Sequence, residues 1–390
     1  ATVIYTNSLK PWFAVIWSGM WNFLGVLLGG IGVAMSIVNL LPVETLVDQN
    51  LAHSISMVMA LLITAIFWNL LTWYLGIPCS SSHTLIGSIL GVGLAYSLLP
   101  EASAGAVNWG KAEEIGLSLL LSPLFGFSMT IVLMYVIRSF TRKTKYGDSL
   151  FKEPKKNQPP PSIIRGVLIL TCTLVSFFHG QNDGQKGVGL VMLILIGIVP
   201  MYFALDVNLS PTEIPQSLAR IERVVSSIDS TTLSAPDRQK LTESRAMSAR
   251  LVRRFASLDF VGDIPKAERF LVRKDVMVLD RNLKEISDQE EVKLSATEKT
   301  VLKAELKSLR RVTDYAPDWV ILMISLSLGL GTMIGWKRIV KTVGEKIGKE
   351  HLTYAQGASA EMVAASTIGL SSYFSLPVST THVLSSGIAG

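Results

Sequence analysis

Charged side chains are scarce in this sequence of 390 residues, because Asp, Glu, Lys and Arg make up only 17% of it. Soluble proteins carry about 25%, whereas hydrophobic residues here reach 49% and the mean hydropathy is +0.42. The net charge of +6 is small for this length, and no basic stripe is interleaved with aromatic residues. The composition argues against an ordinary soluble protein and against nucleic acid as a partner, and it indicates a membrane protein.

Cysteine is almost absent, since only Cys79 and Cys172 occur and both lie in apolar stretches. Two such residues cannot form a disulfide framework or a metal site by themselves, so we expect small core side chains. A charged leader is also lacking at residues 1–7, which therefore do not look like a signal peptide.

Long apolar runs are what the sequence does have. A membrane-spanning helix needs about 20 apolar residues. We expect helices over the runs Trp12–Leu41, Ser54–Ile77, Thr84–Leu99, Ile115–Ile137 (softly broken at Pro123 and Gly126), Trp319–Trp336 and Met362–Leu376. The fold class is therefore all-α, a polytopic membrane protein.

The loops between these runs differ in charge. Residues 138–165 and 337–349 are rich in Lys and Arg, whereas 42–53 and 100–114 are acidic and poor in Lys. Short basic loops stay in the cytoplasm. We therefore place the two basic loops inside and the two acidic loops outside.

One apolar region is interrupted by a polar stretch, His179–Gly187, which contains a carboxylate, an ammonium group, three side-chain amides and three glycines. Polar irregular backbone survives in a membrane only where it lines an enclosed cavity. An ionisable group at that depth is by default a functional-site hypothesis. The pattern is typical of the discontinuous helices with which secondary transporters bind their substrates.

Residues 206–317 are soluble in character. Ile214, Leu218, Ile221 and Val225 recur at helical spacing, and Ser295 to Glu298 forms a capping-box pattern. We expect a small helical insert, placed outside the membrane if the polar segment crosses once.

A short internal repeat joins the two ends of the chain. Pro78-Cys-Ser-Ser-Ser-His83 aligns without a gap with Pro377-Val-Ser-Thr-Thr-His382, and the matches continue to Gly91 and Gly390. Such a motif predicts an internal duplication, and two halves related in this way would form an inverted repeat with re-entrant hairpins.

The duplicated motif has the chemistry of an anion site. A proline followed by hydroxyl residues places free backbone N–H groups and hydroxyls at a positive helix end, where an oxyanion binds. Hydroxyl and carbonyl oxygens could equally ligate a small cation, or the hydroxyls could simply bond to their own helices. The candidate oxyanion contacts are Ser80, Ser81, Ser82, Ser379, Thr380 and Thr381.

Two histidines and one acid–base pair accompany these hydroxyls. His83 and His382 either orient the neighbouring loop as hydrogen-bonded imidazoles or contact substrate or protons. Asp183 could form a plain ion pair with Lys186, but we expect it to bind or exchange the coupling cation.

These motifs resemble the inorganic phosphate transporter (PiT) family, and most closely its bacterial low-affinity branch. The resemblance rests on residues 78–87, 179–187, 331–336 and 377–382 and covers nearly all of the membrane part, with the insert as the variable portion. It implies two inverted repeats, each with an Asn-Asp signature and a hydroxyl-rich hairpin, enclosing phosphate near the centre of the membrane.

The resemblance also implies roles for individual residues. Asn182 and Asp183 would contact phosphate together with the hydroxyls named above. The cation-coupling set would be Asn182, Asp183, Gln185 and Lys186, and the supporting residues would be Gly180, Gly184, His83 and His382.

The implied activity is import of inorganic phosphate, with no cofactor and no enzymatic step. The bacterial branch implies proton symport of phosphate as a neutral complex with a divalent metal, in the bacterial inner membrane, whereas other members use sodium. The sequence does not decide between H⁺ and Na⁺ as the coupling ion, or between a monomer and a homo-oligomer. An intramembrane hydrolase that uses Ser and His is a weaker alternative, because the histidine directly follows the hydroxyls in both copies and is not assembled with them as nucleophile and base. A membrane sensor with an external helical domain is also weaker, because nothing after the insert resembles a signalling module.

The family's first Asn-Asp signature is absent, and the chain begins where the segment after it would begin. The last helices of the second half are also missing, so we expect a fragment. The expected regions are 1–138 (first-repeat membrane region), 139–162 (basic cytoplasmic linker), 163–205 (discontinuous segment), 206–317 (insert) and 318–390 (second-repeat membrane region).

Overall fold

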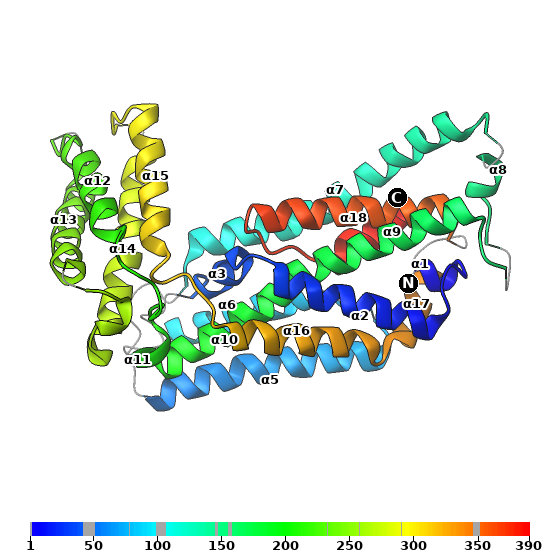
Figure 1. Cartoon of the computed structure of the whole chain (residues 1–390), viewed down its shortest axis with the longest axis horizontal. Coiled ribbons are helices and arrows are strands. Elements are labelled where there is room, and N and C mark those ends of the chain that lie inside the picture. The colour runs from blue at the N-terminus through cyan, green and yellow to red at the C-terminus, as the bar shows by residue number, and fades with distance from the viewer. Residues whose placement is uncertain are drawn as a thin grey trace. The chain divides into compact units, whose positions relative to one another are not determined.

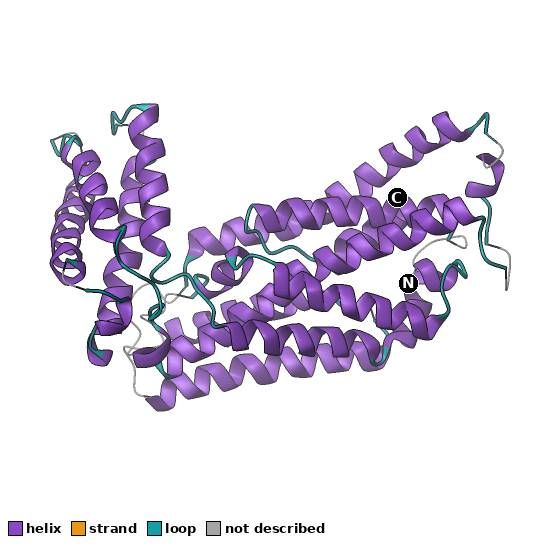
Figure 2. Cartoon of the chain, in the orientation of Figure 1, coloured by secondary structure: helices purple, strands orange, loops and turns teal. Residues whose placement is uncertain are grey.

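The computed structural model describes residues 2–41, 51–77, 79–98, 107–144, 147–154, 158–231, 233–256, 258–289, 291–345 and 352–390. Every regular element among them is helical, as Figure 2 shows. The chain divides into two compact units, one formed by Ala1–Ile194 with Pro317–Gly390 and the other by Leu195–Ala316. The all-α polytopic fold expected from the sequence is thus confirmed.

The helices of the first unit come from both ends of the chain (Figure 1). Their bounds are α1 Thr2–Tyr5, α2 Pro11–Leu28, α3 Gly32–Val38, α5 Leu51–Leu75, α6 Ser81–Ser97, α7 Trp109–Thr141, α8 Gly147–Leu150, α9 Ser162–His179, the π-helix η1 Gly180–Gly184, α10 Gln185–Ile198, α16 Asp318–Met333, α17 Trp336–Glu345, α18 Tyr354–Tyr373 and α19 Thr380–Ala389.

Several of these helices can cross a membrane. Within the described residues, Pro11–Leu28, His53–Leu75, Trp109–Thr141 and the continuous stretch Ser162–Ile198 are long and apolar enough. The pair α16 and α17, bent by 58°, would make a further span. Large apolar side chains lie exposed on α5 and α7, for example Phe67 at 63% and Leu120 at 71%. Such surface is stable in contact with lipid, and not in water.

Two expected runs differ from the observed helices. Trp12–Leu41 is not one helix, because α2 ends at Leu28 and α3 begins only at Gly32. Pro123 and Gly126 do not interrupt α7, which runs through both. A proline is tolerated in a membrane helix where Ser or Thr side chains and neighbouring helices satisfy the freed backbone groups.

The polar stretch after α9 is a π-helical turn. The chain passes from α9 through Gly180–Gly184 into α10 without leaving helical conformation. The interruption therefore takes the form of a wider turn inside one long helix, a feature often found at functional sites.

The internal repeat is visible in the backbone. At the end of α5, Gly76 has φ +70° and its N–H and that of Ile77 bond to the carbonyls of Trp73 and Thr72. At the end of α18, Ser375 has φ +61° and the N–H groups of residues 375 and 376 bond to those of residues 372 and 371. Both are Schellman C-caps at positions that correspond in the repeat.

The second unit is a helical bundle with its own core. Its elements are α11 Pro200–Phe203, α12 Ile214–Ser226, α13 Ala235–Phe255, the 3₁₀ turns η2 Val261–Asp263 and η3 Lys266–Glu268, α14 Arg269–Ser287 and α15 Ala296–Arg310. Buried side chains such as Leu218, Leu251 and Leu279 form one apolar cluster inside it. The capping box predicted at Ser295 and Glu298 is confirmed.

Ion pairs join neighbouring helices of this bundle. Arg220 donates to Glu305 through Nε at 2.5 Å and Nη2 at 3.0 Å, which links α12 to α15. Burial alone would raise the pKa of Glu305, but the hydrogen bonds from Arg220 and Ser217 and the positive charge of Arg220 together outweigh it and hold that pKa below its usual value. The bundle thus depends in part on an ionised carboxylate.

Candidate functional site

Glycines let the π turn lie against α2. A Cβ atom on Gly180 would overlap the backbone carbonyl of Asn22, and one on Gly184 would overlap the side chain of Val26. Only glycine therefore fits at these positions without moving α2. This close approach to α2 fixes the position of Asp183, which lies between the two glycines in the sequence.

Asp183 receives contacts from both copies of the repeated motif. Thr380 donates its hydroxyl to Asp183 Oδ2 at 3.0 Å, and Ser81 reaches the same oxygen at 3.5 Å, a long contact. His179 Nε2 lies 3.3 Å from that oxygen as well. The carboxylate is therefore surrounded by groups from the end of α9, from α6 and from α19.

Lys186 lies beside this carboxylate and is only 3% exposed. Its Nζ donates to Asp183 Oδ1 at 2.6 Å, to Ser82 Oγ at 2.5 Å and to the Val378 carbonyl at 2.6 Å. The three N–H donors of an ammonium group thus meet three oxygen acceptors.

Asn182 attaches the π turn to the second hairpin, which is formed by α18, α19 and the loop between them. Its amide nitrogen donates to Ser372 Oγ at 3.0 Å and to the Leu376 carbonyl at 3.1 Å, and its Oδ1 accepts from the Val378 N–H at 3.2 Å. Asn182 is fully buried. It therefore holds the loop that precedes α19 in place.

The two repeated motifs open their helices in the same way. Ser80 caps α6 and accepts from the His83 N–H at 3.2 Å, and Ser379 caps α19 and accepts from the His382 N–H at 3.2 Å. The two imidazole rings lie 4.7 Å apart between centroids. The N-terminal ends of α6 and α19, which carry partial positive charge, are therefore neighbours.

Some sequence-predicted residues make no hydrogen bond to Asp183 or Lys186. Gln185 turns away from Asp183, because its amide nitrogen donates to the Val26 carbonyl of α2 at 3.2 Å. Thr381 is not among the groups that bond to Asp183 or Lys186. Pro78 of the first motif lies outside the described residues.

Two polar residues in apolar helices were missed by the sequence analysis. Asn22 Oδ1 lies 2.7 Å from His179 Nδ1 and accepts a hydrogen bond from the tautomer that is protonated at Nδ1, and so orients the histidine beside Asp183. Glu361 of α18 is 2% exposed and accepts from the Thr171 hydroxyl at 2.7 Å. The available signals were Asn22 inside the expected run Trp12–Leu41 and Glu361 one residue before the expected start of the run Met362–Leu376.

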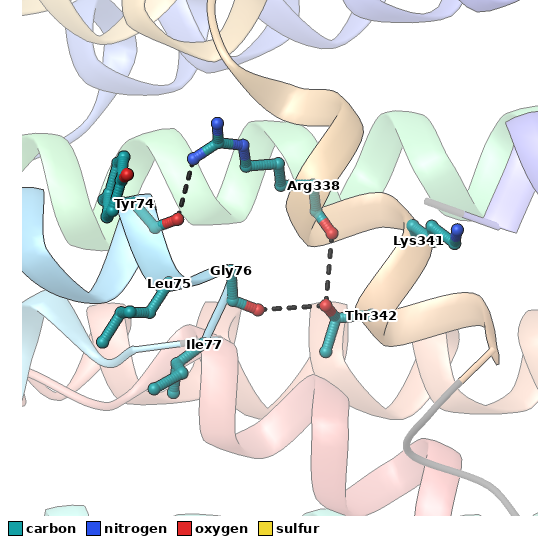
Figure 3. A pocket seen from close by; sticks show the side chains of 7 residues that line it. All are labelled: Tyr74, Leu75, Gly76, Ile77, Arg338, Lys341 and Thr342. Atoms are coloured by element: carbon teal, nitrogen blue, oxygen red, sulfur yellow. Dashed lines mark hydrogen bonds between the residues drawn. The ribbon is translucent and has the colours of Figure 1, made fainter.

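A separate cavity of about 530 Å³ lies where α5 ends, and it shares no residue with the cluster around Asp183 (Figure 3). Arg338 donates to the Tyr74 carbonyl at 2.7 Å and stands 5.3 Å from that tyrosine ring, while Thr342 donates to the Gly76 carbonyl at 3.0 Å. Aromatic and basic residues of this kind anchor a helix end at a membrane interface.

The described residues contain no group of three or more His, Cys, Asp or Glu side chains that could hold a metal ion. The polar cluster is built from hydroxyls, amides, the imidazoles of His83, His382 and His179, and one carboxylate–ammonium pair. It offers N–H and O–H donors to an anion and hard oxygen atoms to a small cation.

Comparison with known sequences assigns this architecture. The profile of the phosphate transporter family matches residues 1–390. The chain belongs to the phosphate transporter family. Its relatives include the low-affinity inorganic phosphate transporter PitB of Escherichia coli (strain K12), 37% identical over 419 residues, which cover 100% of this chain and 84% of PitB.

A further relative and a solved structure support the same family assignment and fold. The low-affinity inorganic phosphate transporter of Buchnera aphidicola subsp. Acyrthosiphon pisum (strain APS) is 38% identical over 412 residues, covering 100% of this chain and 83% of the relative. A solved structure titled "The sodium-dependent phosphate transporter" shares the fold, with a TM-score of 0.51 at 19% identity over 99% of this chain and 82% of that one. The resemblance inferred from the motifs is confirmed, and the family is one of transporters, not of enzymes.

Proposed function

We propose that this chain imports inorganic phosphate across the bacterial inner (plasma) membrane by proton symport with alternating access. The observation that carries the proposal is the position of Asp183, whose carboxylate meets hydroxyls from both copies of the duplicated motif. A site formed between two repeats is where rocking of one repeat against the other changes access. The names of the relatives supply the substrate class.

Phosphate would bind at the paired N-termini of α6 and α19. Each helix begins with a hydroxyl cap, and the N–H groups of its first turn have no partner within the helix. With the two helix starts side by side, these N–H groups favour an oxyanion. Ser81, Thr380 and Thr381 are the hydroxyls that this assignment places on phosphate, while Ser80 and Ser379 shape the helix ends by capping. Ser82 would not contact phosphate itself but would hold Lys186 in place by accepting its hydrogen bond.

Proton coupling would use groups that lie within this cluster. Asp183 and His179 are 3.3 Å apart, and the His83 and His382 rings adjoin the same helix ends. Imidazole changes its charge near physiological pH, and a carboxylate beside it provides a second proton-binding group. If a divalent metal travels with phosphate, it does so as part of the substrate.

Transport into proteoliposomes tests both the substrate and the coupling ion. We expect radiolabelled phosphate uptake to follow an imposed inward proton gradient with no Na⁺ present. Asp183→Asn should abolish uptake, whereas Asp318→Asn, an exposed acid in the first turn of α16, serves as the matched control and should leave it intact. Uptake that requires Na⁺ and ignores pH would replace the proton by sodium, and unchanged uptake in Asp183→Asn would remove the site assignment.

A further inference from the structure

The position of the Lys186 ammonium group has the geometry of a cation site. Its nitrogen is surrounded by a carboxylate oxygen, a hydroxyl oxygen and a main-chain carbonyl oxygen at 2.5–2.6 Å. These oxygens belong to three segments that are far apart in the sequence: the π turn, α6 and the loop before α19. A covalently attached cation thus lies where three parts of the molecule meet.

The three oxygens form a donor set suited to a hard monovalent ion. Carboxylate, hydroxyl and carbonyl oxygens are the ligands that alkali and alkaline-earth cations prefer over nitrogen or sulfur. Without a positive charge among them, the Asp183 carboxylate, whose side chain is 10% exposed, would carry a largely uncompensated charge, which is costly. A cation is therefore required there whenever the three segments meet and Asp183 is ionised.

We infer that Lys186 is a built-in substitute for a coupling sodium ion, and that removing its ammonium group opens a Na⁺ site made by Asp183 Oδ1, Ser82 Oγ and the Val378 carbonyl. The inference rests on the proposed phosphate symport and assigns its ion selectivity to one residue. A tethered cation cannot cross the membrane with phosphate. The chain therefore transports without Na⁺, and the coupling charge is carried by protons.

The simpler alternative is that Lys186 only stabilises the fold through its hydrogen bonds. In that case its removal would weaken the protein, and no particular ion would restore it. A cation site predicts instead that Na⁺ restores what the ammonium supplied, and that the restoration requires Asp183.

The first experiment measures phosphate uptake by Lys186→Ala in proteoliposomes. In Na⁺-free medium we expect uptake to fall at least tenfold, and NaCl, but not choline chloride, should restore most of it. The native protein should ignore the exchange of Na⁺ for choline. Lys341→Ala, which removes a lysine lining the separate cavity near α17, is the matched control and should show neither loss nor Na⁺ rescue.

The second experiment does not depend on transport and so separates this inference from the proposed function. Ligand that binds only the folded state raises its melting temperature. We expect NaCl, compared with choline chloride at equal ionic strength, to raise the melting temperature of purified Lys186→Ala by several degrees. It should have no specific effect on the native protein or on the double variant Lys186→Ala/Asp183→Asn.

The outcomes are distinct. Absence of a Na⁺ effect on both uptake and melting of Lys186→Ala overturns the inference, as does a native protein that itself requires Na⁺. A Na⁺-specific rise in melting temperature without any phosphate uptake by the native protein would support the cation site and reject the proposed function.

Discussion

The two copies of the hydroxyl motif have the same local structure and different surroundings. Ser80 and Ser379 cap their helices with matching φ and ψ, −87° and 105° against −85° and 94°. The second copy, however, is fastened to the π turn by Asn182 and by the 3.0 Å bond from Thr380. The first copy reaches the π turn only through the long Ser81 contact among the described hydrogen bonds, while its Ser82 bonds to Lys186 of α10 and to the Val378 carbonyl of the second copy.

This difference indicates which hairpin can move. The second hairpin and the π turn share three amide hydrogen bonds, so separating them would leave buried polar groups without partners. The first hairpin is joined to this region by fewer polar contacts, namely the Ser82 hydroxyl, which bonds to Lys186 and to the Val378 carbonyl, and the long Ser81 contact. We therefore expect the α5–α6 hairpin to change position during transport, while α18–α19 stays with α9 and α10.

The largest expected effect comes from breaking the tighter attachment. Asn182→Ala removes three hydrogen bonds, each worth about 1 kcal/mol net, so phosphate uptake should fall on the order of 100-fold. Ser372→Ala, which removes one partner of the same amide, should lose much less. Equal losses in the two variants would show that the bonds to Leu376 and Val378 do not matter.

A smaller effect should distinguish the two hydroxyls on Asp183. A hydrogen bond to a charged group contributes about 1.5–3 kcal/mol, so Thr380→Ala should reduce uptake at least about tenfold. Ser81→Ala removes only a 3.5 Å contact and should cost less than about threefold. Initial rates of the two variants, with Thr380→Ser as the control that keeps the hydroxyl, measure the asymmetry. A larger loss for Ser81 would reverse it.

The C-caps before the two motifs offer a comparison in stability. A Cβ at Gly76 would meet nothing closer than 3.9 Å, so Gly76→Ser is opposed only by its φ of +70°. A left-handed non-glycine residue costs about 1–2 kcal/mol. Gly76→Ser should lower the melting temperature in detergent, whereas Ser375→Gly should raise it slightly by removing the same strain. Opposite shifts would mean that packing, not backbone conformation, governs these caps.

The smallest effect on transport is expected from substitutions in the second unit, with which the effects of the hairpin substitutions can be compared. Ser295→Ala removes a helix cap worth about 1 kcal/mol, so amide hydrogen exchange in α15 should accelerate while phosphate uptake stays unchanged. Lost uptake with a folded α15 would give the insert a role in transport.

The same cap predicts a pH dependence. The Ser295 hydroxyl and N–H bond to the carboxylate of Glu298 and hold its pKa below the usual value. Because the folded-state pKa is lowered, this stabilisation is present above the ordinary pKa of glutamate and is lost as the pH falls through the lowered one. The protection factors of the α15 amides, which correct for the pH dependence of intrinsic exchange, should therefore fall on acidification in the native protein, and much less so in Ser295→Ala.

Much of the fold followed from local patterns. The apolar runs, the capping box at Ser295 and the hydroxyl caps depend on residues three or four positions apart, and such contacts form wherever the helix forms. The duplicated motif likewise predicted two matching helix starts. The polar stretch around Asp183 was identified because a carboxylate inside an apolar run is costly unless it has partners.

The sequence by itself thus determined the membrane class, the family, the repeated caps and the position of the polar turn. Only the tertiary structure decided the partners: that Asn22 orients His179, that Gln185 faces α2, and that Lys186 joins Ser82 to Val378. These contacts join residues more than a hundred positions apart, and no local pattern specifies them. Helix packing selects among many hydroxyls and amides of similar chemistry, because every buried polar group must find an acceptor or donor within reach.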